Sequence, residues 1–219
     1  TSGAGQEGLN EIYYTDDPNV FNSSNLAVAA LTQVSYKESD GLIIEADVLI
    51  NKGNAISTNV NNYAYAGNIY THELGHLLGL DHSQVIGSTM FWALSHGQNQ
   101  VAEDDKAGLF SIYLPSDSTK SFISGKIVGG KNLIGIFGVE VEAVSQATGK
   151  IAGSSITNYD GTFKIEGLPV GDKYFIYSKP SVFDKLSSKY STVKTNFCDA
   201  GSSFRGSFYQ ACGGSHEGY

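Results

Sequence analysis

The sequence predicts an α+β domain with a mixed sheet and two helices, followed by an all-β sandwich domain. Both helix-like segments lie before Pro115, and the roughly one hundred residues after it hold only short alternating runs separated by Gly, Asn and Asp turns. The composition agrees, because 26 glycines, 13 tyrosines and only 16% charged residues are typical of a turn-rich, strand-rich chain. We therefore expect domains at residues 1–114 and 121–219, joined by an exposed linker at 115–120.

Three segments of the first domain are candidate strands. Residues 11–15 and 42–50 are dominated by β-branched and aromatic side chains, which favour strands. Residues 26–36 are ambiguous, because their alanines favour a helix whereas their valines, threonine and tyrosine favour a strand. The sequence leaves that choice open.

Two helices are expected in the same domain. Residues 68–80 show the helical spacing of apolar side chains, with Asn68 as the N-cap. The side chains expected to supply the buried surface of this helix are Ile69, Leu74, Leu77 and Leu78. Residues 103–114 form the second helix, since acidic side chains occupy its first turn, where the helix dipole favours negative charge.

The second domain contains only candidate strands. They lie at residues 123–128, 138–144, 154–157, 161–165 and 173–178. In the run VEVEAV, valine and alanine side chains fall on one face and Glu140 and Glu142 on the other. This alternation predicts a strand with one face in the core and one in water.

Three of the five histidines fall in the run HELGHLLGLDHS, residues 72–83. On a helix, His72 and His76 lie on one face, roughly 6 Å apart along the axis, so both imidazoles can converge on one ion. Gly79 tolerates the left-handed conformation that ends a helix, which allows the chain to turn and present His82 as a third nitrogen ligand. Three ligands leave one position of tetrahedral Zn²⁺ open to water, as in catalytic sites.

Glu73 adds proton chemistry to this set. It adjoins the first ligand and, in an HExxH pattern, points towards the metal-bound water without binding the metal. It can accept the proton of that water and deliver it to the leaving amine, while zinc lowers the pKa of the water towards about 7 and polarises the scissile carbonyl. The pattern therefore predicts a zinc-dependent endopeptidase that hydrolyses peptide bonds.

The run from His72 to Ser83, followed seven residues later by Met90, resembles the metzincin clan of zinc endopeptidases and, within it, the matrixin type. The resemblance implies a zincin-type catalytic domain with an active-site helix and a C-terminal helix. It also implies that the three histidines bind the metal, that Glu73 is catalytic, and that Met90 lies on a tight turn as the floor of the site. Astacins and serralysins carry a tyrosine at the position of Trp92.

The resemblance extends over much of residues 10–114 and implies how substrate binds. Backbone groups near Leu26 and Ala27 would pair with an extended peptide. Phe91 and Trp92 would help to wall the pocket for the residue after the cleaved bond. No histidine precedes the helix, so we expect one zinc ion and not the second, structural zinc of the family.

Two features depart from the family pattern. The family places a strand, a long helix and another strand before the strand at residues 11–15, and only about ten residues precede it here. Those elements have been removed, lie in a segment outside this sequence, or are lacking in a minimal variant. The proline that commonly follows the Met-turn is also missing.

Residues 156–176 resemble the carboxypeptidase-regulatory, transthyretin-like sandwich. They share its Asp-Gly-x-Phe turn, here at residues 160–163, followed by Gly-Leu-Pro-x-Gly at residues 167–171. In that family the sandwich is an accessory module without catalysis of its own. We therefore expect no second active site in this domain.

Charge and composition limit the partners. The chain has 14 Lys and Arg against 22 Asp and Glu, a formal net charge of -8, and no basic cluster. This is the wrong sign for binding phosphates, so we expect protein or peptide substrates and not nucleic acid. No apolar run is long enough to predict a transmembrane segment. The composition favours a secreted or extracellular protein, with cell-surface association as a further option.

The only cysteines, Cys198 and Cys212, have thirteen residues between them. A disulfide between them would stabilise the fold by roughly 3 kcal/mol and requires an oxidising compartment. Alternatively, the Cys212 thiolate could occupy the open zinc position and make the enzyme latent. The competing function is therefore a catalytically weak or latent metzincin whose β-sandwich serves binding or adhesion.

Other polar residues give weaker signals. Matrixins often bind Ca²⁺ as well as zinc, and oxygen ligands for it could come from Asp16, Asp17, Asp40 and Asp47. Scattered acids are usually solvated charge. We also expect solvated side chains at His96 and His216.

Overall fold

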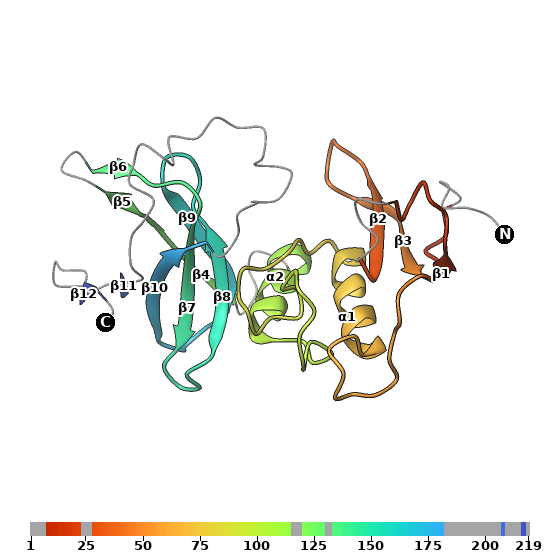
Figure 1. Cartoon of the computed structure of the whole chain (residues 1–219). Helices are drawn as coiled ribbons and strands as arrows, with labels where there is room; N and C mark the ends of the chain where they lie inside the picture. Colours follow the sequence, from red (N-terminus) through yellow and green to blue (C-terminus); the bar gives the residue numbers. More distant parts are fainter. Residues whose placement is uncertain are drawn as a thin grey trace. The chain divides into compact units, whose positions relative to one another are not determined.

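The computed structural model describes residues 8–22, 28–114, 120–129, 133–181, 207–208 and 216–217 (Figure 1). By its internal contacts the chain divides into two compact units. The first comprises Thr1–Asp81 and Gly87–Ala102, and the second comprises His82–Ile86 and Glu103–Tyr219. The expected substrate-binding edge at Leu26 and Ala27 lies outside the described residues and stays a prediction. The same holds for the disulfide between Cys198 and Cys212.

The first unit contains a three-stranded mixed sheet. β1 (Ile12–Thr15) pairs in parallel with the central strand β3 (Ile43–Asn51), and β2 (Ala30–Tyr36) pairs antiparallel with the other edge of β3. The ambiguous segment therefore forms a strand from Ala30 onwards. The segment adopts strand structure because its hydrogen bonds to β3 outweigh the weak helix propensity of its alanines.

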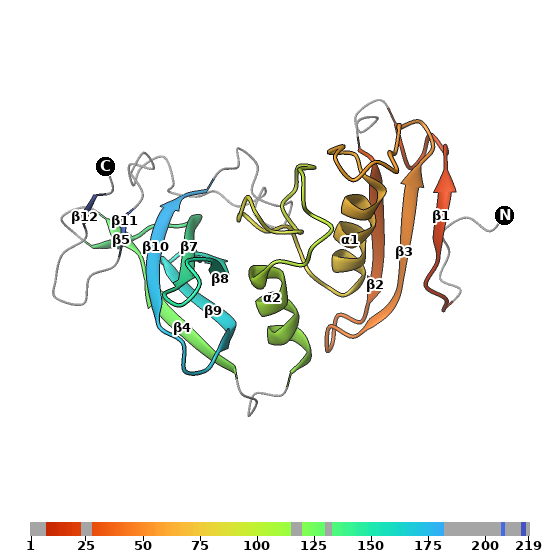
Figure 2. The ribbon, with the colours of Figure 1, turned by 90° about the horizontal axis from the view of Figure 1, so that it is seen from below.

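Helix α1 (Ala66–Leu77) lies along β2 and β3 (Figure 2). A shared core of Ala30, Val48, Ile50 and Ile69 joins the helix to the sheet. The prediction that Leu74 and Leu78 are buried is wrong, because their exposed fractions are 41% and 39%. At 100° per residue they lie roughly 140° and 180° around the helix from Ile69, away from the stripe that meets the sheet.

The N-terminus of α1 also differs from the prediction. The helix begins after Tyr65, so Asn68 lies inside the first turn and is not its N-cap. The buried Asn68 amide donates hydrogen bonds to the carbonyls of Tyr63 and Ser95, and its Oδ1 accepts one from the backbone N–H of Asn99. Asn68 thus joins the start of α1 to the loop that follows the Met-turn.

The second unit contains one helix and two main sheets. Helix α2 (Glu103–Tyr113) forms where the sequence predicts the second helix. By its contacts it belongs to this unit. The domain limits predicted at residues 114 and 121 stay predictions. The strands are β4 (Lys120–Lys126), β5 (Val128–Gly129), β6 (Ile134–Gly135), β7 (Val139–Ser145), β8 (Ile151–Ile156), β9 (Thr162–Pro169), β10 (Tyr174–Pro180), β11 (Ser207–Phe208) and β12 (His216–Glu217). The larger sheet has the order β12-β11-β10-β7-β8, whereas β4 pairs with β9 and β5 with β6.

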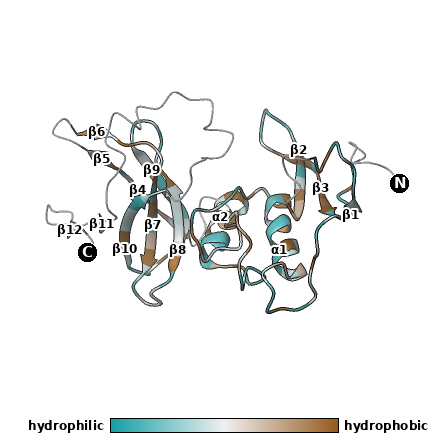
Figure 3. Cartoon of the chain, in the orientation of Figure 1, coloured by the Kyte–Doolittle hydropathy of each residue, from teal (hydrophilic) through white to brown (hydrophobic). Residues whose placement is uncertain are grey.

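One hydrophobic core unites the two main sheets of this unit. β7 and β8 contribute Val139, Val141, Ala143 and Ala152, and β9 contributes Phe163, Ile165 and Leu168. Figure 3 shows hydrophobic residues along these strands. Two sheets that share a core are compatible with a sandwich, and the transthyretin-like assignment stays a prediction. No helix in the described ranges is long and apolar enough to cross a membrane.

Strand β7 corrects the prediction of a half-solvated strand. Its valines enter the core as expected, but Glu140 and Glu142 are buried too, with exposed fractions of 0% and 4%. β7 lies between β8 and β10, and the Lys179 ammonium of β10 lies 3.3 Å from Glu140 Oε1 and 2.7 Å from Glu142 Oε1. The Lys179 ammonium thus contacts two buried carboxyl groups that alternation alone would place in water.

Candidate metal centre

The end of α1 turns the chain sharply after the second histidine. Gly79 has a φ of 90°, which confirms the left-handed turn predicted there. The Gly79 N–H donates to the His76 carbonyl at 2.8 Å, and the Leu80 N–H donates to the Gly75 carbonyl at 3.0 Å. These two bonds form a Schellman motif, which satisfies carbonyls that the helix end leaves open. The segment that carries His82 follows directly.

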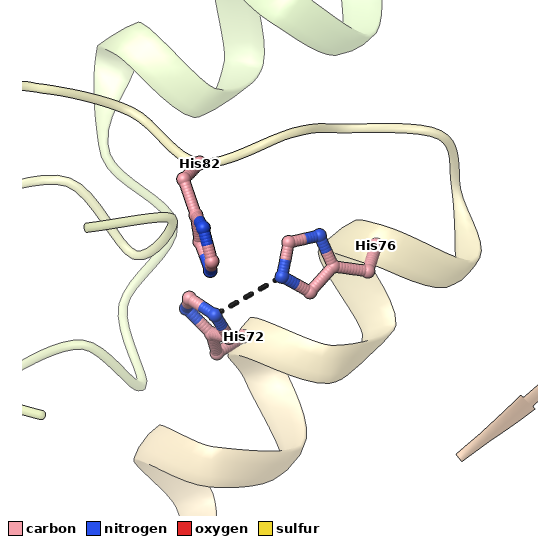
Figure 4. Close-up of side chains that lie close together, drawn as sticks. All are labelled: His72, His76 and His82. Carbon is pink, nitrogen blue, oxygen red and sulfur yellow. Dashed lines mark hydrogen bonds between the residues drawn. The ribbon is translucent and has the colours of Figure 1, made fainter. Parts of the chain in front are cut away.

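Three histidines converge after this turn (Figure 4). His72 and His76 project from α1, and His82 comes from the segment beyond Gly79. Each offers one ring nitrogen, and these nitrogens all lie within 4.8 Å of one another. Among the described residues, this is the group of three or more side chains that could hold a metal ion. The fold therefore brings together the three histidines that the sequence spacing predicts.

Hydrogen bonds define which ring nitrogens face the centre. His72 Nδ1 lies 2.8 Å from the Thr89 carbonyl oxygen, and His76 Nδ1 lies 2.8 Å from the Leu80 carbonyl oxygen. Because a carbonyl can only accept, each Nδ1 carries a hydrogen, so the nitrogen of each ring that remains able to bind a metal is Nε2. The two Nε2 atoms lie 3.2 Å apart. Facing lone pairs repel unless a cation lies between them, so the donor set fits a shared metal ion.

Glu73 lies on the same helix and is buried. The Thr32 hydroxyl of β2 lies 2.6 Å from Glu73 Oε2 and 3.1 Å from the Glu73 carbonyl oxygen, so it donates to this residue from the neighbouring strand. The bond orients the carboxylate and leaves Oε1 outside that contact. Sequence reasoning missed Thr32, because 41 positions separate the pair and only the docking of α1 on β2 brings them together.

The segment around Met90 also contacts α1. Met90 is buried, and a Cβ added at Gly75 would collide with its sulfur, so the glycine lets Met90 pack directly against the helix. The Met90 N–H donates to Ser88 Oγ at 3.0 Å. The Thr89 carbonyl beside Met90 is the acceptor for His72 Nδ1. This turn therefore supplies both an apolar contact and a ligand-orienting acceptor, and the sequence pointed to Met90 but not to Gly75 or Thr89.

The expected wall of the substrate pocket follows this turn. The rings of Phe91 and Trp92 make a tilted contact, with their centroids 5.9 Å apart. Trp92 is 53% exposed, and His96 is exposed as expected. The role of both aromatic side chains in substrate binding stays a prediction.

The four aspartates considered for calcium have local roles in the described structure. The buried Asp47 accepts a hydrogen bond from the Glu11 N–H at 3.0 Å. Asp17 and Asp40 accept hydrogen bonds from backbone N–H groups two residues ahead, as in Asx-turns. Asp16 lies 3.7 Å from a lysine ammonium. Calcium binding stays a prediction.

Comparison with known proteins points to one family. Residues 14–114 match the family model described as Matrixin. The chain is 28% identical over 169 residues to the interstitial collagenase of Oryctolagus cuniculus, a match that covers 75% of this chain and 29% of the relative. The chain therefore spans less than a third of that relative. No solved structure gave a significant match.

These matches support a matrix metalloproteinase-like domain, and we refer to residues 14–114 as the matrixin-like domain. It contains the three converging histidines, Glu73 and Met90. The mixed sheet and the two helices fit a zincin-like catalytic domain. The family implies zinc, and the histidine cluster is able to bind a metal.

Proposed function

We propose that this protein is a zinc-dependent endopeptidase that hydrolyses peptide bonds in proteins or peptides. In this proposal His72, His76 and His82 hold one zinc ion, and Glu73 is the general base. The supporting observation is the convergence of three ring nitrogens within 4.8 Å, beside a buried carboxylate from the same helix. The match to the Matrixin model supports the same reaction class.

The residues around the histidines have separate tasks. A bound zinc ion would lower the pKa of a coordinated water molecule and polarise the scissile carbonyl. The carbonyls of Thr89 and Leu80 fix the tautomer and the orientation of two imidazoles. Thr32 holds Glu73 at Oε2, so Oε1 can accept a proton and later deliver it to the leaving amine.

Other features of the proposal lie around this centre. Met90 forms an apolar floor, and Phe91 and Trp92 wall the pocket for the residue after the cleaved bond. We also propose that the protein acts outside the cell, which its turn-rich composition supports. The second unit is proposed as a transthyretin-like accessory domain, because its two sheets share one core.

Cleavage of an unfolded protein by the full chain tests this function. We expect the zinc-loaded chain to cleave, a chelator to stop cleavage, and added zinc to restore it. Glu73→Gln should lower kcat/KM by about 10²- to 10⁴-fold, because it removes the general base but not a metal ligand. Zinc content, measured on the same sample, should be unchanged.

Glu103→Gln is the matched control, because it removes the same charge from an exposed position on α2. It should cleave like the unmodified chain. Cleavage that resists the chelator, or a Glu73→Gln variant as active as this control, would overturn the proposal.

A further inference from the structure

The loop after the Met-turn is held by two buried side-chain amides. We call residues 91–100 the wall loop, because it begins with Phe91 and Trp92. All of these residues are described, and none lies in a helix or strand. Backbone N–H and C=O groups in such a segment cannot pair in a regular ladder, so side chains or water must satisfy them. Gln98 in the loop and Asn68 on α1 supply such partners, and both side chains are buried.

Gln98 uses both amide hydrogens and the amide oxygen within the wall loop. Its Nε2 donates to the carbonyls of Phe91 and Ala93, each at 3.0 Å. Its Oε1 accepts a hydrogen bond from the Ser95 N–H at 2.7 Å. Because a carbonyl only accepts and an N–H only donates, these partners define the orientation of the amide. Phe91 and Ala93 flank Trp92 in the chain, so Gln98 fixes the backbone on both sides of this residue.

Asn68 attaches the rest of the wall loop to α1. Its amide donates to the Ser95 carbonyl at 3.0 Å, and its Oδ1 accepts a hydrogen bond from the Asn99 N–H at 3.0 Å. The same amide donates to the Tyr63 carbonyl at 3.1 Å, in the segment before the helix. Asn68 lies four positions before His72 on α1. The wall loop, α1 and the segment before it all belong to the first unit.

Further contacts within the first unit complete the attachment of the wall loop. Leu94 is partly buried and packs against the core that joins α1 to the sheet. The Thr89 hydroxyl donates to the Gln100 carbonyl at 3.1 Å, which connects the end of the loop to the Met-turn. Buried polar groups whose hydrogen bonds are satisfied make a segment rigid. The wall loop is therefore held by contacts of the chain itself, without a bound peptide.

We propose that Gln98 and Asn68 are positioning residues for the pocket wall and help to determine which side chain is accepted after the cleaved bond. They hold the wall loop, so Phe91 and Trp92 need less ordering when a peptide binds, and less ordering strengthens binding. A fixed wall also discriminates between side chains of different shape, whereas a mobile wall adapts to each of them. The proposal rests on the proposed function, in which Phe91 and Trp92 line this pocket.

The side chain of Trp92 tests this role without a substrate, because it is the only tryptophan of the chain. Gln98→Met keeps the size of the side chain but removes its three hydrogen bonds. The nanosecond fluorescence anisotropy of Trp92 should decrease, because the loop around it becomes mobile. The Asn99 amide hydrogen keeps its acceptor on Asn68, yet it should exchange with solvent about tenfold faster as the loop opens.

Two further variants separate the buried amides from other effects. Gln100→Met makes the same chemical change at an exposed position of the wall loop and should alter neither the anisotropy nor the exchange. Asn68→Leu keeps the approximate size of the second amide and should lower the anisotropy of Trp92 as Gln98→Met does. The Val48 amide of β3 should exchange as in the unmodified chain, because the effect is local.

Cleavage of peptides that differ only in the residue after the cleaved bond measures the effect on specificity. Gln98→Met should raise KM for the best peptide about 2- to 10-fold with little change in kcat, because the lost order must be restored on binding. The differences in kcat/KM among the peptides should become smaller. Gln100→Met should keep the kinetics of the unmodified chain.

Three results would overturn the proposal. They are an unchanged Trp92 anisotropy in both Gln98→Met and Asn68→Leu, equal acceleration of exchange at Val48 and Asn99, and unchanged KM and peptide preference in an active Gln98→Met variant. The anisotropy and exchange measurements need no substrate. A chain that shows the expected changes in both but cleaves no peptide would overturn only the proposed function.

Discussion

Each unit of this protein buries a polar cluster, and the two clusters differ in where their positive charge comes from. In the second unit, the Lys179 ammonium contacts the buried carboxylates Glu140 and Glu142. In the first unit, neutral groups hold the buried side chains, namely the Thr89 carbonyl for His72 and the Thr32 hydroxyl for Glu73. The ring nitrogens of the histidine cluster could bind a cation from solution, whereas the cluster of Glu140 and Glu142 is supplied with a cation by Lys179.

Removal of one histidine should abolish metal binding by the cluster of His72, His76 and His82. His76→Ala leaves two imidazoles, and we expect it to lose zinc binding at concentrations that saturate the unmodified chain. Zinc at a hundred times its dissociation constant should stabilise the unmodified chain by about 2.7 kcal/mol. Thermal unfolding with and without zinc measures this shift, which should vanish in the variant. His96→Ala, an exposed histidine, is the control, and a zinc-dependent shift in His76→Ala would contradict the assignment.

The second cluster should respond to pH and not to zinc. Burial raises the pKa of Glu140 to about 8 from an ordinary value of 4.5, although Lys179 acts in the opposite direction. The folded state therefore binds the proton more tightly than the unfolded state between these values. The free energy of unfolding should fall as pH rises from about 4.5 to 8, by at most about 1.4 kcal/mol per pH unit for this group.

Glu140→Gln should remove this part of the pH dependence. Urea unfolding between pH 5 and pH 8 measures it in both proteins. Glu166→Gln changes an exposed carboxylate on β9 and serves as the control. Equal slopes in Glu140→Gln and this control would show that the Glu140 proton does not contribute.

A smaller effect should come from the hydroxyl that orients Glu73. Thr32→Val keeps the shape of the side chain but removes the hydrogen bond to Glu73 Oε2, and it should lower kcat about tenfold with little change in KM. Thr32→Ser keeps the donor and should retain most of the activity. Equal kcat values for the valine and serine variants would contradict a role for the hydroxyl.

Patterns of neighbouring residues in the sequence predicted much of the histidine cluster. The four-residue spacing of His72 and His76 and the glycine at position 79 depend on local backbone geometry, and the structure shows both features as expected. The five strands predicted after residue 120 overlap β4, β7, β8, β9 and β10. These predictions succeeded because the determining residues lie within about two helical turns or one strand.

The misses depend on partners that are distant in sequence. Asn68 has the residue type of an N-cap, but its amide binds the Ser95 and Asn99 backbone instead. Glu140 alternates like a solvent-facing residue, but Lys179 lies across from it on β10. Nothing in the local sequence distinguishes Gly75 from other helix residues, and its importance follows from the Met90 side chain that packs against it. A local sequence pattern does not show which residues of two separate elements lie opposite each other. Contacts of this kind can therefore be identified only in the folded structure.

X-ray absorption of zinc in the loaded full chain measures which atoms bind the metal. We expect a first shell of three imidazole nitrogens and one oxygen at about 2.0–2.1 Å. That result would also exclude the latent form in which the Cys212 thiolate fills the fourth position. A sulfur ligand at about 2.3 Å, or a shell with fewer than three imidazoles, would contradict an open three-histidine site.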